Sequence, residues 1–495
     1  MFDPFEKDIL TISSSLRQND TSSVSLTEYY LERIDLYDRK GPCLNSIIAC
    51  NPHALDDAGK LDEERKAGKI RSVLHGIPIV IKDNIDFAGM PTTAGSLVLE
   101  HSYPAEDAFI IKKLREAGAV IIAKTSLTEF ARHGVTVNSL IGQTRNPYDL
   151  ERTPGGSSGG TGAAVAANMA AAGLGSDTVN SIRSPASANN LAGIRPTTGL
   201  LSRRGLVPCS CTQDTAGPLA RTVADAAVLL GICAGHDPAD PKTAEQTDRY
   251  HGYPKSPLAD YLKSITKHGA KDKKIGLLQN NFGEHPDVLA VMERTITVLR
   301  ELGASIVPLS VPEFESSLLI RTCDVQLFET KPCLNSYLES IPECPIKNIN
   351  DLVTSGKLHK SIYDDMKSCA ELANPMEQNE YFVRLFRINQ KRSLAFQIMA
   401  EHELDAFLYP HQQILVEPIV NQSQRGRNGI LASVIGFPAI TLPGGFSKPD
   451  KTAPLGVPIG IEFMARPYKE QTLFEIASAF EFHSPYRTAP VSSPQ

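Results

Sequence analysis

The chain has 495 residues, of which 41% are hydrophobic and 21% charged, a balance typical of a soluble globular protein with an extensive core. Its formal net charge of −6 argues against a nucleic-acid-binding protein that relies on overall positive charge. No apolar stretch approaches the roughly 20 residues of a membrane-spanning helix, and residues 1–8 lack the apolar core of a signal peptide. We therefore expect a cytoplasmic protein that binds neither nucleic acid nor membrane.

The first third of the chain alternates helical and strand patterns. Helical periodicity or charge patterning covers 5–40, 56–66 and 105–117, and short apolar runs predict strands at 44–50, 76–81 and 120–124. Pro78 places its strand at a sheet edge or marks the first residue of that strand. Residues 132–160 are rich in turn-forming residues. This alternation favours an α/β architecture.

The rest of the chain continues the alternation around a long helical region. Small residues at 161–172 predict a closely packed helix, and Thr222 is the expected N-cap of a helix over 222–233. A βαβ unit is expected over 274–278, 286–302 and 305–309, then helices over 313–400, strands at 405–409 and 438–442, and a closing helix over 468–481.

No internal repeat or low-complexity linker divides the chain. Prolines and charges gather at 236–272, which indicates a surface connection. We therefore expect one domain over 1–495, with a helical N-terminal part over 1–60 and an insertion-like substrate cap over 240–400.

Nine thinly spread cysteines predict reduced thiols, because the number is odd and the chain is large. Cys209 and Cys211 form one close pair, but no second such pair accompanies it, so a zinc site is not expected. The twelve histidines show no metal-binding spacing. We expect neither a metal nor a cofactor.

Two segments carry residues that suggest chemistry. Residues 76–85 read Gly-Ile-Pro-Ile-Val-Ile-Lys-Asp-Asn-Ile, an apolar run that leads into Lys82. Residues 155–160 read Gly-Gly-Ser-Ser-Gly-Gly and contain Ser157, and residues 176–185 read Ser-Asp-Thr-Val-Asn-Ser-Ile-Arg-Ser-Pro and contain Ser181. A serine is a weak nucleophile until a base takes its proton.

Lys82 can serve as such a base only when its amine is neutral. The ordinary lysine pKa of about 10.4 opposes this, and burial behind the preceding strand would lower it. An acidic neighbour would resist that shift, and Asp83 is adjacent in sequence. Strand alternation, however, directs Asp83 to the face opposite Lys82.

These segments resemble the amidase signature family, whose members hydrolyse amides with a Ser-Ser-Lys triad. The resemblance implies that Ser181 is the nucleophile, that Ser157 is a bridging serine on a cis peptide, and that Lys82 is the terminal base. It also implies the amidase-signature fold, a large mixed central β-sheet flanked by helices on both faces. Flanking matches at 125–130, 193–197, 214–225 and 436–443 extend the resemblance, whereas 240–400 carries no motif that aligns.

Successive backbone N–H groups over 178–181 are the expected oxyanion hole. The expected oxyanion and substrate contacts lie on the two serine-bearing loops: Thr178, Val179, Asn180, Gly156 and Ser158. The family usually has Gly-Gly immediately before the nucleophile, whereas this chain has Val-Asn. Asparagine tolerates a left-handed backbone and branched valine does not, so we expect a differently shaped and narrower hole.

Charged residues near these loops are assigned structural roles. Arg183 is expected to be a buried ion-pair partner, and Asp177 to tie down the glycine-rich loop. Asp214 and Arg221 are expected to form an ion pair or to anchor loops.

Residues 155–159 also fit the Gly-x-Ser-x-Gly nucleophile elbow of α/β-hydrolases. That motif needs a strand directly before it, and 146–154 does not read as one. His133, the nearest preceding histidine, is therefore expected to be structural.

The resemblance implies an amidase that cleaves a small-molecule carboxamide through an acyl-enzyme, releases ammonia or an amine, and forms a homodimer. Three alternatives remain open. The acyl-enzyme could be intercepted by an amine or a hydroxyl, which makes an acyltransferase or amide synthase. The chain could be the amidase subunit of a tRNA-dependent amidotransferase, or a scaffold that keeps the fold without the activity.

Overall fold

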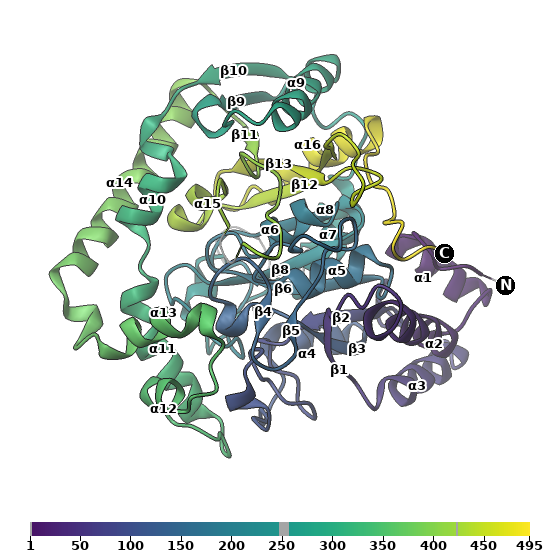
Figure 1. Cartoon of the computed structure of the whole chain (residues 1–495). Coiled ribbons are helices and arrows are strands. Elements are labelled where there is room, and N and C mark those ends of the chain that lie inside the picture. Colours follow the sequence, from purple (N-terminus) through teal and green to yellow (C-terminus); the bar gives the residue numbers. More distant parts are fainter. Residues whose placement is uncertain (1, 247–256, 422–423) are drawn as a thin grey trace.

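Eleven strands of the chain form one mixed sheet, with helices packed on both of its faces (Figure 1). The computed structural model describes residues 2–246, 257–421 and 424–495. The strand order is β1-β3-β2-β6-β8-β7-β12-β13-β11-β9-β10, parallel over β3-β2-β6 and β11-β9-β10 and antiparallel elsewhere. The expected α/β class and mixed sheet are confirmed.

The sheet strands are β1 (Ile47–Cys50), β2 (Pro78–Lys82), β3 (Val120–Thr125), β6 (Ala172–Asp177), β7 (Ala192–Arg195), β8 (Thr215–Ala220), β9 (Lys274–Leu278), β10 (Ser305–Leu309), β11 (Ala406–Pro410), β12 (Ala439–Phe446) and β13 (Pro458–Ala465). A separate hairpin is formed by β4 (Val137–Asn138) and β5 (Gly142–Gln143).

The α-helices are α1 (Ile9–Gln18), α2 (Ser23–Arg33), α3 (Ala54–Lys66), α4 (Phe109–Glu116), α5 (Gly159–Ala166), α6 (Arg183–Ala188), α7 (Val223–Cys233), α8 (Leu258–Lys263), α9 (Pro286–Glu301), α10 (Ser316–Cys323), α11 (Gln326–Ser340), α12 (Ile349–Thr354), α13 (Lys360–Glu371), α14 (Asn379–Glu401), α15 (Ile430–Ile435) and α16 (Glu470–His483). A π-helical stretch, Ile34–Arg39, follows α2.

Several sequence-based expectations hold in detail. The Thr222 hydroxyl caps α7 by accepting from the backbone N–H of Asp225. The βαβ unit is formed by β9, α9 and β10, whose strands pair in parallel, and the region after it is helical through α14. Pro78 is the first residue of β2, but β2 lies between β3 and β6, so the edge alternative is wrong.

Other expectations were wrong for identifiable reasons. The helix expected over 161–172 ends at Ala166, because Asn168 adopts a left-handed conformation (φ 55°), and the chain then enters β6. The hairpin strands β4 and β5 were not expected. Nor were three strands of the main sheet, namely β7, β8 and β13. Their glycines and prolines lower the local strand propensity, and burial within the sheet outweighs that preference.

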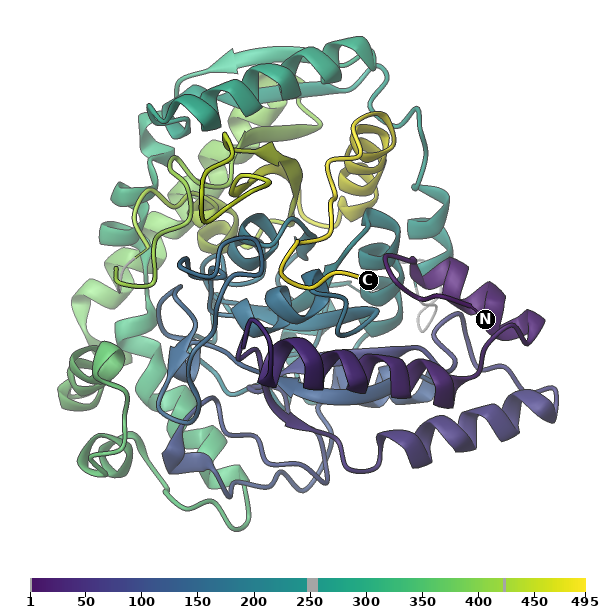
Figure 2. The ribbon, with the colours of Figure 1, turned by 45° about the vertical axis from the view of Figure 1, so that its right-hand side comes forward.

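Helices α10 to α14 form an arc along one side of the sheet (green in Figure 1). On the opposite side, the C-terminal segment lies beside the N-terminal helices α1 and α2 (Figures 1 and 2). The Arg33 guanidinium of α2 donates to the backbone oxygens of Ser493 and Pro494 at 3.0 Å. No helix of the described residues is both long and apolar enough to cross a membrane.

The parallel pair β2 and β6 brings two chemically important ends of the chain together. Ile79, Val80 and Ile81 of β2 pair with successive residues of β6, so Lys82 and Asp177 end their strands at the same sheet edge. Helix α5 packs against both strands. Its glycines allow this, because a Cβ atom on Gly160 would meet the Ser126 backbone oxygen at 2.3 Å.

We expect Gly160→Ala to destabilise the protein by about 2–3 kcal/mol or more, because backbone atoms of Ser126 and Ser46 would have to move. Gly59→Ala on α3 is the matched control: its Cβ meets nothing closer than 4.0 Å. That change should stabilise the protein by about 0.5–1 kcal/mol. Urea unfolding measures both changes, and equal effects of the two would contradict the packing argument.

Candidate active site

Lys82 and Ser157 meet in the buried centre of the molecule. The Lys82 amine lies 2.8 Å from the Ser157 hydroxyl, and both side chains are fully buried. The Gly156–Ser157 peptide bond is cis, as the resemblance implied. Burial lowers the pKa of Lys82 to about 7, so an appreciable neutral fraction exists near neutral pH.

Two further acceptors surround the Lys82 amine. It contacts the hydroxyl of Ser176 at 2.8 Å and its backbone oxygen at 3.5 Å. The Asn84 side-chain amide donates to the same hydroxyl at 2.9 Å. With Ser157, these groups offer three oxygens to the three hydrogens of a protonated amine. Ser176 and Asn84 lie in the motif segments, but their sequence positions gave no reason to assign them this role.

Asp83 points away from Lys82, as strand alternation predicted. Its carboxylate forms an ion pair with Lys124 of β3 at 3.0 Å and accepts a short hydrogen bond from the Thr93 hydroxyl. Lys82 therefore keeps only uncharged oxygen partners in direct contact, and the adjacent acid does not restore its ordinary pKa.

Residues 178–181 form a turn, called the Ser181 turn below, that carries a row of backbone N–H groups without protein acceptors. In the described part of the chain, no acceptor is found for the N–H groups of Val179, Asn180 and Ser181, while the next one, of Ile182, donates to Asp177 at 3.0 Å. The Ser181 hydroxyl likewise has no hydrogen-bond partner among the described residues. Unpaired N–H groups beside a free hydroxyl are what an oxyanion hole beside a nucleophile requires.

The Val-Asn pair does not strain this turn. Neither Val179 nor Asn180 is among the residues with positive φ, so side chains fit where the family usually has glycines. The Val179 side chain packs against an apolar cluster from α10, α14 and α15. The Asn180 amide donates to the backbone oxygen of Asn428 at 3.3 Å. Both side chains thus attach the turn to later parts of the chain.

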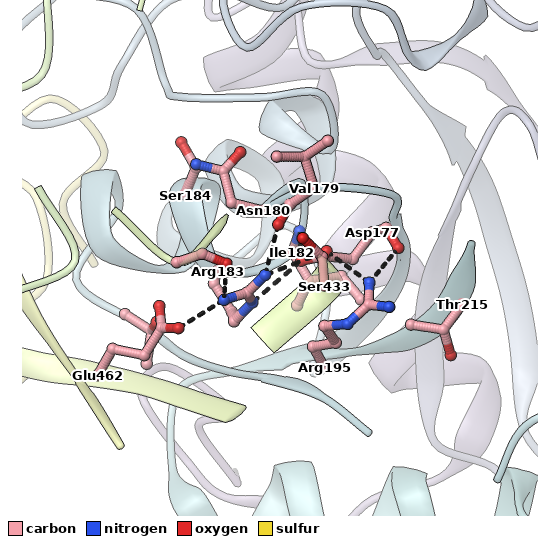
Figure 3. A network of polar contacts seen from close by, with 12 residues as sticks. Asp177, Val179, Asn180, Ile182, Arg183, Ser184, Arg195, Thr215, Ser433 and Glu462 are labelled. Carbon is pink, nitrogen blue, oxygen red and sulfur yellow. Dashed lines mark hydrogen bonds and ion pairs between the residues drawn. The ribbon is translucent and has the colours of Figure 1, made fainter. Parts of the chain in front are cut away.

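A buried ion network fixes the turn from below (Figure 3). Asp177 pairs with Arg183 at 3.2 Å and with Arg195 at 2.9 Å, and Arg183 pairs in turn with Glu462 of β13. The Arg183 guanidinium also donates to the Val179 backbone oxygen at 2.7 Å. Burial alone would raise the pKa of Asp177, but the two arginines outweigh it and lower the pKa to about 2.

These contacts confirm Arg183 as a buried ion-pair partner. Asp177 has the expected structural role, but it holds the Ser181 turn and not the glycine-rich loop. Its carboxylate contacts the two arginines and the Ile182 N–H. Asp214 accepts from the Thr178 hydroxyl at 2.6 Å, and Arg221 donates to backbone oxygens. The loop-anchor assignment of these two residues is confirmed.

The glycine-rich loop approaches the Ser181 turn through its backbone. The Ser158 N–H donates to the Ser181 backbone oxygen at 3.2 Å, and the Ser158 hydroxyl binds the Ser176 backbone. Gly156 faces Gly134 and Thr136, where a Cβ atom would meet neighbours closer than 3.0 Å. No hydrogen bond joins the Ser157 and Ser181 hydroxyls in this structure. Catalytic hydrogen bonds often tighten only when substrate binds.

A cavity of about 150 Å³ opens in front of Ser181. It is lined by Ala131, Arg132, His133, Thr178, Val179, Asn180, Ser181, Asp324, Gln326, Asp365 and Arg427. Three of the expected contact residues, at 178–180, therefore face it, whereas Gly156 and Ser158 are not among its lining residues. Sequence reasoning could not find Asp324, Asp365 and Arg427, which come from regions without an aligned motif.

The other chemistry considered from the sequence finds no matching geometry. Residues 146–154 form turns and isolated bridges and not a strand. The strand that a Gly-x-Ser-x-Gly nucleophile elbow requires directly before it is therefore missing. All nine cysteines, each within the described residues, are free thiols. Among those residues no group of three or more metal-ligating side chains is placed to hold a metal ion.

The family model Amidase matches residues 25–474. The chain belongs to the amidase family. It is 32% identical to a glutamyl-tRNA(Gln) amidotransferase subunit of Thermosynechococcus vestitus, over 97% of this chain and 98% of that protein. It is also 32% identical to a probable amidase of Arabidopsis thaliana, over 96% of this chain and 90% of that protein.

Solved structures of the family agree with the fold. A peptide amidase from Stenotrophomonas maltophilia superposes with a TM-score of 0.90 at 35% identity, covering 100% of both chains. An amidase family protein from Bacillus anthracis superposes with a TM-score of 0.85 at 29% identity, covering 98% of this chain and 92% of that one. The amidase-signature fold that the resemblance implied is confirmed.

We expect Asp177→Asn to destabilise the protein by about 3–5 kcal/mol, because it leaves two buried guanidinium groups without their shared carboxylate. In the wild type, the ionised Asp177 carboxylate adds its full share to the free energy of unfolding above about pH 3.9, the pKa of an aspartate in the unfolded chain. This stabilisation is lost as the pH falls through the folded-state pKa of about 2. Urea unfolding at pH 7 measures the change.

Glu63→Gln is the control for this measurement, since it removes one partner of an exposed ion pair with Lys66. Exposed pairs contribute little, so the unfolding midpoint should hardly move. An Asp177→Asn variant as stable as this control would show that the network is not essential.

Proposed function

We propose that this protein hydrolyses the carbon–nitrogen bond of a small carboxamide through a serine acyl-enzyme. The observation that carries the proposal is the buried contact between Lys82 and Ser157. Near it, the turn over 178–181 lines a cavity, and its N–H groups at 179–181 have no acceptor among the described residues. A lysine with a pKa of about 7 can accept a proton at neutral pH, which an exposed lysine cannot.

In the proposed reaction, the Ser181 hydroxyl oxygen attacks the carbonyl carbon of the substrate. Its proton moves to Ser157, whose own proton moves to Lys82, and the N–H groups near 178–181 stabilise the oxyanion. As the carbon–nitrogen bond breaks, the relay returns a proton to the leaving nitrogen, which departs as ammonia or an amine. Water then attacks the acyl-serine with the same relay as base and releases the carboxylic acid.

We further propose that the chain works as a single domain in which 240–400 covers the substrate site. Asp324, Gln326 and Asp365 support this, since all three belong to that segment and line the Ser181 cavity. A homodimer and a cytoplasmic location remain predictions.

Likeness to a peptide amidase along the whole chain supports hydrolysis by the chain alone. Likeness to amidotransferase subunits supports the alternative in which the chain releases ammonia for a partner. Ammonia release by the isolated chain would favour the first. Products formed with added amines would instead indicate acyl transfer, and a Ser181 that cannot be acylated would indicate a scaffold.

The first test is covalent labelling with a fluorophosphonate followed by peptide mapping. We expect one adduct, on Ser181, that is absent in Ser181→Ala and formed at least about 10³-fold more slowly in Lys82→Ala. Lys112→Ala, which changes a lysine exposed on α4, is the matched control and should label at the wild-type rate. Labelling of another serine, or a normal rate in Lys82→Ala, would contradict the proposed triad.

The pH dependence of amide hydrolysis should report the Lys82 amine. Because the base must be neutral, kcat/KM should rise about tenfold per pH unit below pH 7 and level off above it. His133 also lines the cavity, and burial lowers its pKa from the ordinary value. The acidic limb should therefore persist in His133→Gln, and its loss there would assign the limb to the histidine.

A further inference from the structure

A second cavity, of about 690 Å³, lies between a core loop and helix α11. Its lining includes two thiols, one from Cys211 in the loop and one from Cys333 on the helix. Cys211 is exposed and Cys333 is half-buried, so small molecules in solution can reach both. The lining residues described for this cavity and for the Ser181 cavity do not overlap, so neither thiol belongs to the proposed catalytic site.

Hydrogen bonds hold the residues on either side of Cys211 against α11. The Glu329 carboxylate accepts from the hydroxyl groups of Ser210 and Thr212. It also accepts from the Thr212 backbone N–H at 3.0 Å. The loop segment that contains Cys211 is therefore fixed to one side chain of the helix.

Cys333 lies on the same face of α11 as Glu329. The two are four residues apart, which is close to one helical turn, so both side chains face the loop. On the same part of the helix, the Thr330 hydroxyl donates to the Cys209 backbone oxygen at 2.9 Å. The Cys333 thiol hydrogen-bonds to the Cys211 sulfur. Two thiols in contact, on backbones already fixed to each other, need little chain movement to form a disulfide.

The two thiols differ in reactivity. The hydrogen bond from Cys333 lowers the pKa of Cys211, and the charge of Arg203 acts in the same direction, whereas burial and Glu329 oppose the shift. The same thiol–thiol contact, together with burial, raises the pKa of Cys333. Oxidants react with the thiolate and not with the thiol, so Cys211 is the member of the pair that reacts first.

Three other thiols show what sets Cys211 apart. Burial raises the pKa of Cys209 to about 12, and its thiol donates to the Phe130 backbone oxygen at 3.0 Å. Burial also raises the pKa of Cys233 to about 12. Cys43 is exposed, as Cys211 is, but it lines a different cavity. Oxidation should therefore select the thiol pair on α11 and its facing loop.

The loop that carries Cys211 also supports the turn beside the nucleophile. The Asp214 carboxylate accepts from the Thr178 hydroxyl at 2.6 Å, and it accepts from two backbone N–H groups of the loop at 2.8 and 2.9 Å. A covalent bond at Cys211 would thus join α11 to the loop that anchors this turn.

We propose that Cys211 and Cys333 are a redox-sensitive pair, which hydrogen peroxide converts to a reversible disulfide that links α11 to the loop over 209–214. The Cys211 thiolate attacks one peroxide oxygen, the oxygen–oxygen bond breaks, and a sulfenic acid forms. The released hydroxide takes up the proton that Cys211 had lost and becomes water.

In the second step, the Cys333 sulfur attacks the Cys211 sulfur and the sulfur–oxygen bond breaks. The leaving hydroxide takes the Cys333 proton and departs as a second water. Two thiols have then lost two electrons and two protons, and one peroxide has been reduced to two waters. A dithiol reductant reverses the oxidation by thiol–disulfide exchange.

The first test is non-reducing peptide mapping of the full chain before and after treatment with hydrogen peroxide. We expect one linked peptide pair, which joins Cys211 to Cys333 and which dithiothreitol separates. In Cys333→Ser, the reaction should stop at the Cys211 sulfenic acid, which dimedone traps. Cys211→Ser should leave Cys333 as a thiol. Cys43→Ser is the matched control, because it removes another exposed thiol, and it should form the wild-type link.

The wild-type peptide map decides the pairing by itself, so the inference does not depend on the folding of a variant. A disulfide that joins either Cys211 or Cys333 to another cysteine would overturn it. Recovery of both residues as free thiols after peroxide treatment would overturn it as well.

Thermal unfolding measures the restraint that the link places on α11. A disulfide that closes a loop of roughly 120 residues restricts the unfolded chain, so oxidation should raise the wild-type unfolding midpoint by about 3–6 °C. Reduction should restore the original midpoint, and Cys333→Ser should show no rise. An unchanged midpoint in the oxidised wild type, or an equal rise in the variant, would overturn the inference.

Discussion

The structure depends on the way one buried carboxylate, Asp177, holds two buried guanidinium groups. Charges taken out of water are stable only with well-placed partners. Here the partners come from β6, α6, β7 and, through Glu462, from β13. The network that satisfies these charges therefore also joins two parts of the sheet that are far apart in sequence. It leaves the turn over 178–181 with little freedom, so backbone N–H groups can stay unpaired without collapsing onto other acceptors.

Lys82 lies in the same buried centre, but unlike the two arginines it has no carboxylate in direct contact. Its direct partners are hydroxyl and carbonyl oxygens, and the adjacent Asp83 is engaged by Lys124. Uncharged partners do not offset the loss of hydration, so the pKa of the amine falls to about 7. Removal from water thus has two different results in this centre. Paired groups stay charged and give rigidity, and the amine without a carboxylate partner can become neutral, which proton transfer requires.

The cavity shows how the long helical segment adds to this centre. Arg132 reaches Asp365 of α13 and Thr330 of α11, so a core loop and the helices of the arc share one side of the site. Arg427 comes from a different loop, seated on the Ser181 turn by Asn428. The Lys82–Ser157 contact and these two arginines therefore come from separate parts of the chain, so the cavity lining can change without disturbing that contact.

The sequence by itself determined the local features. These are the alternation of elements, the Thr222 cap, the placement of Asp83 opposite Lys82, and the two motif segments, because each depends on spacing along one strand, helix or loop. It could not predict β7, β8 or β13, whose glycines and prolines are tolerated only inside a finished sheet. Nor could it predict Asp177 as the anchor of the Ser181 turn, the contact of Ser176 with Lys82, or the cavity that Arg427 and Asp324 both line. Those features join residues from distant parts of the chain, and packing, desolvation and the pairing of buried charges decide them only once the sheet has formed.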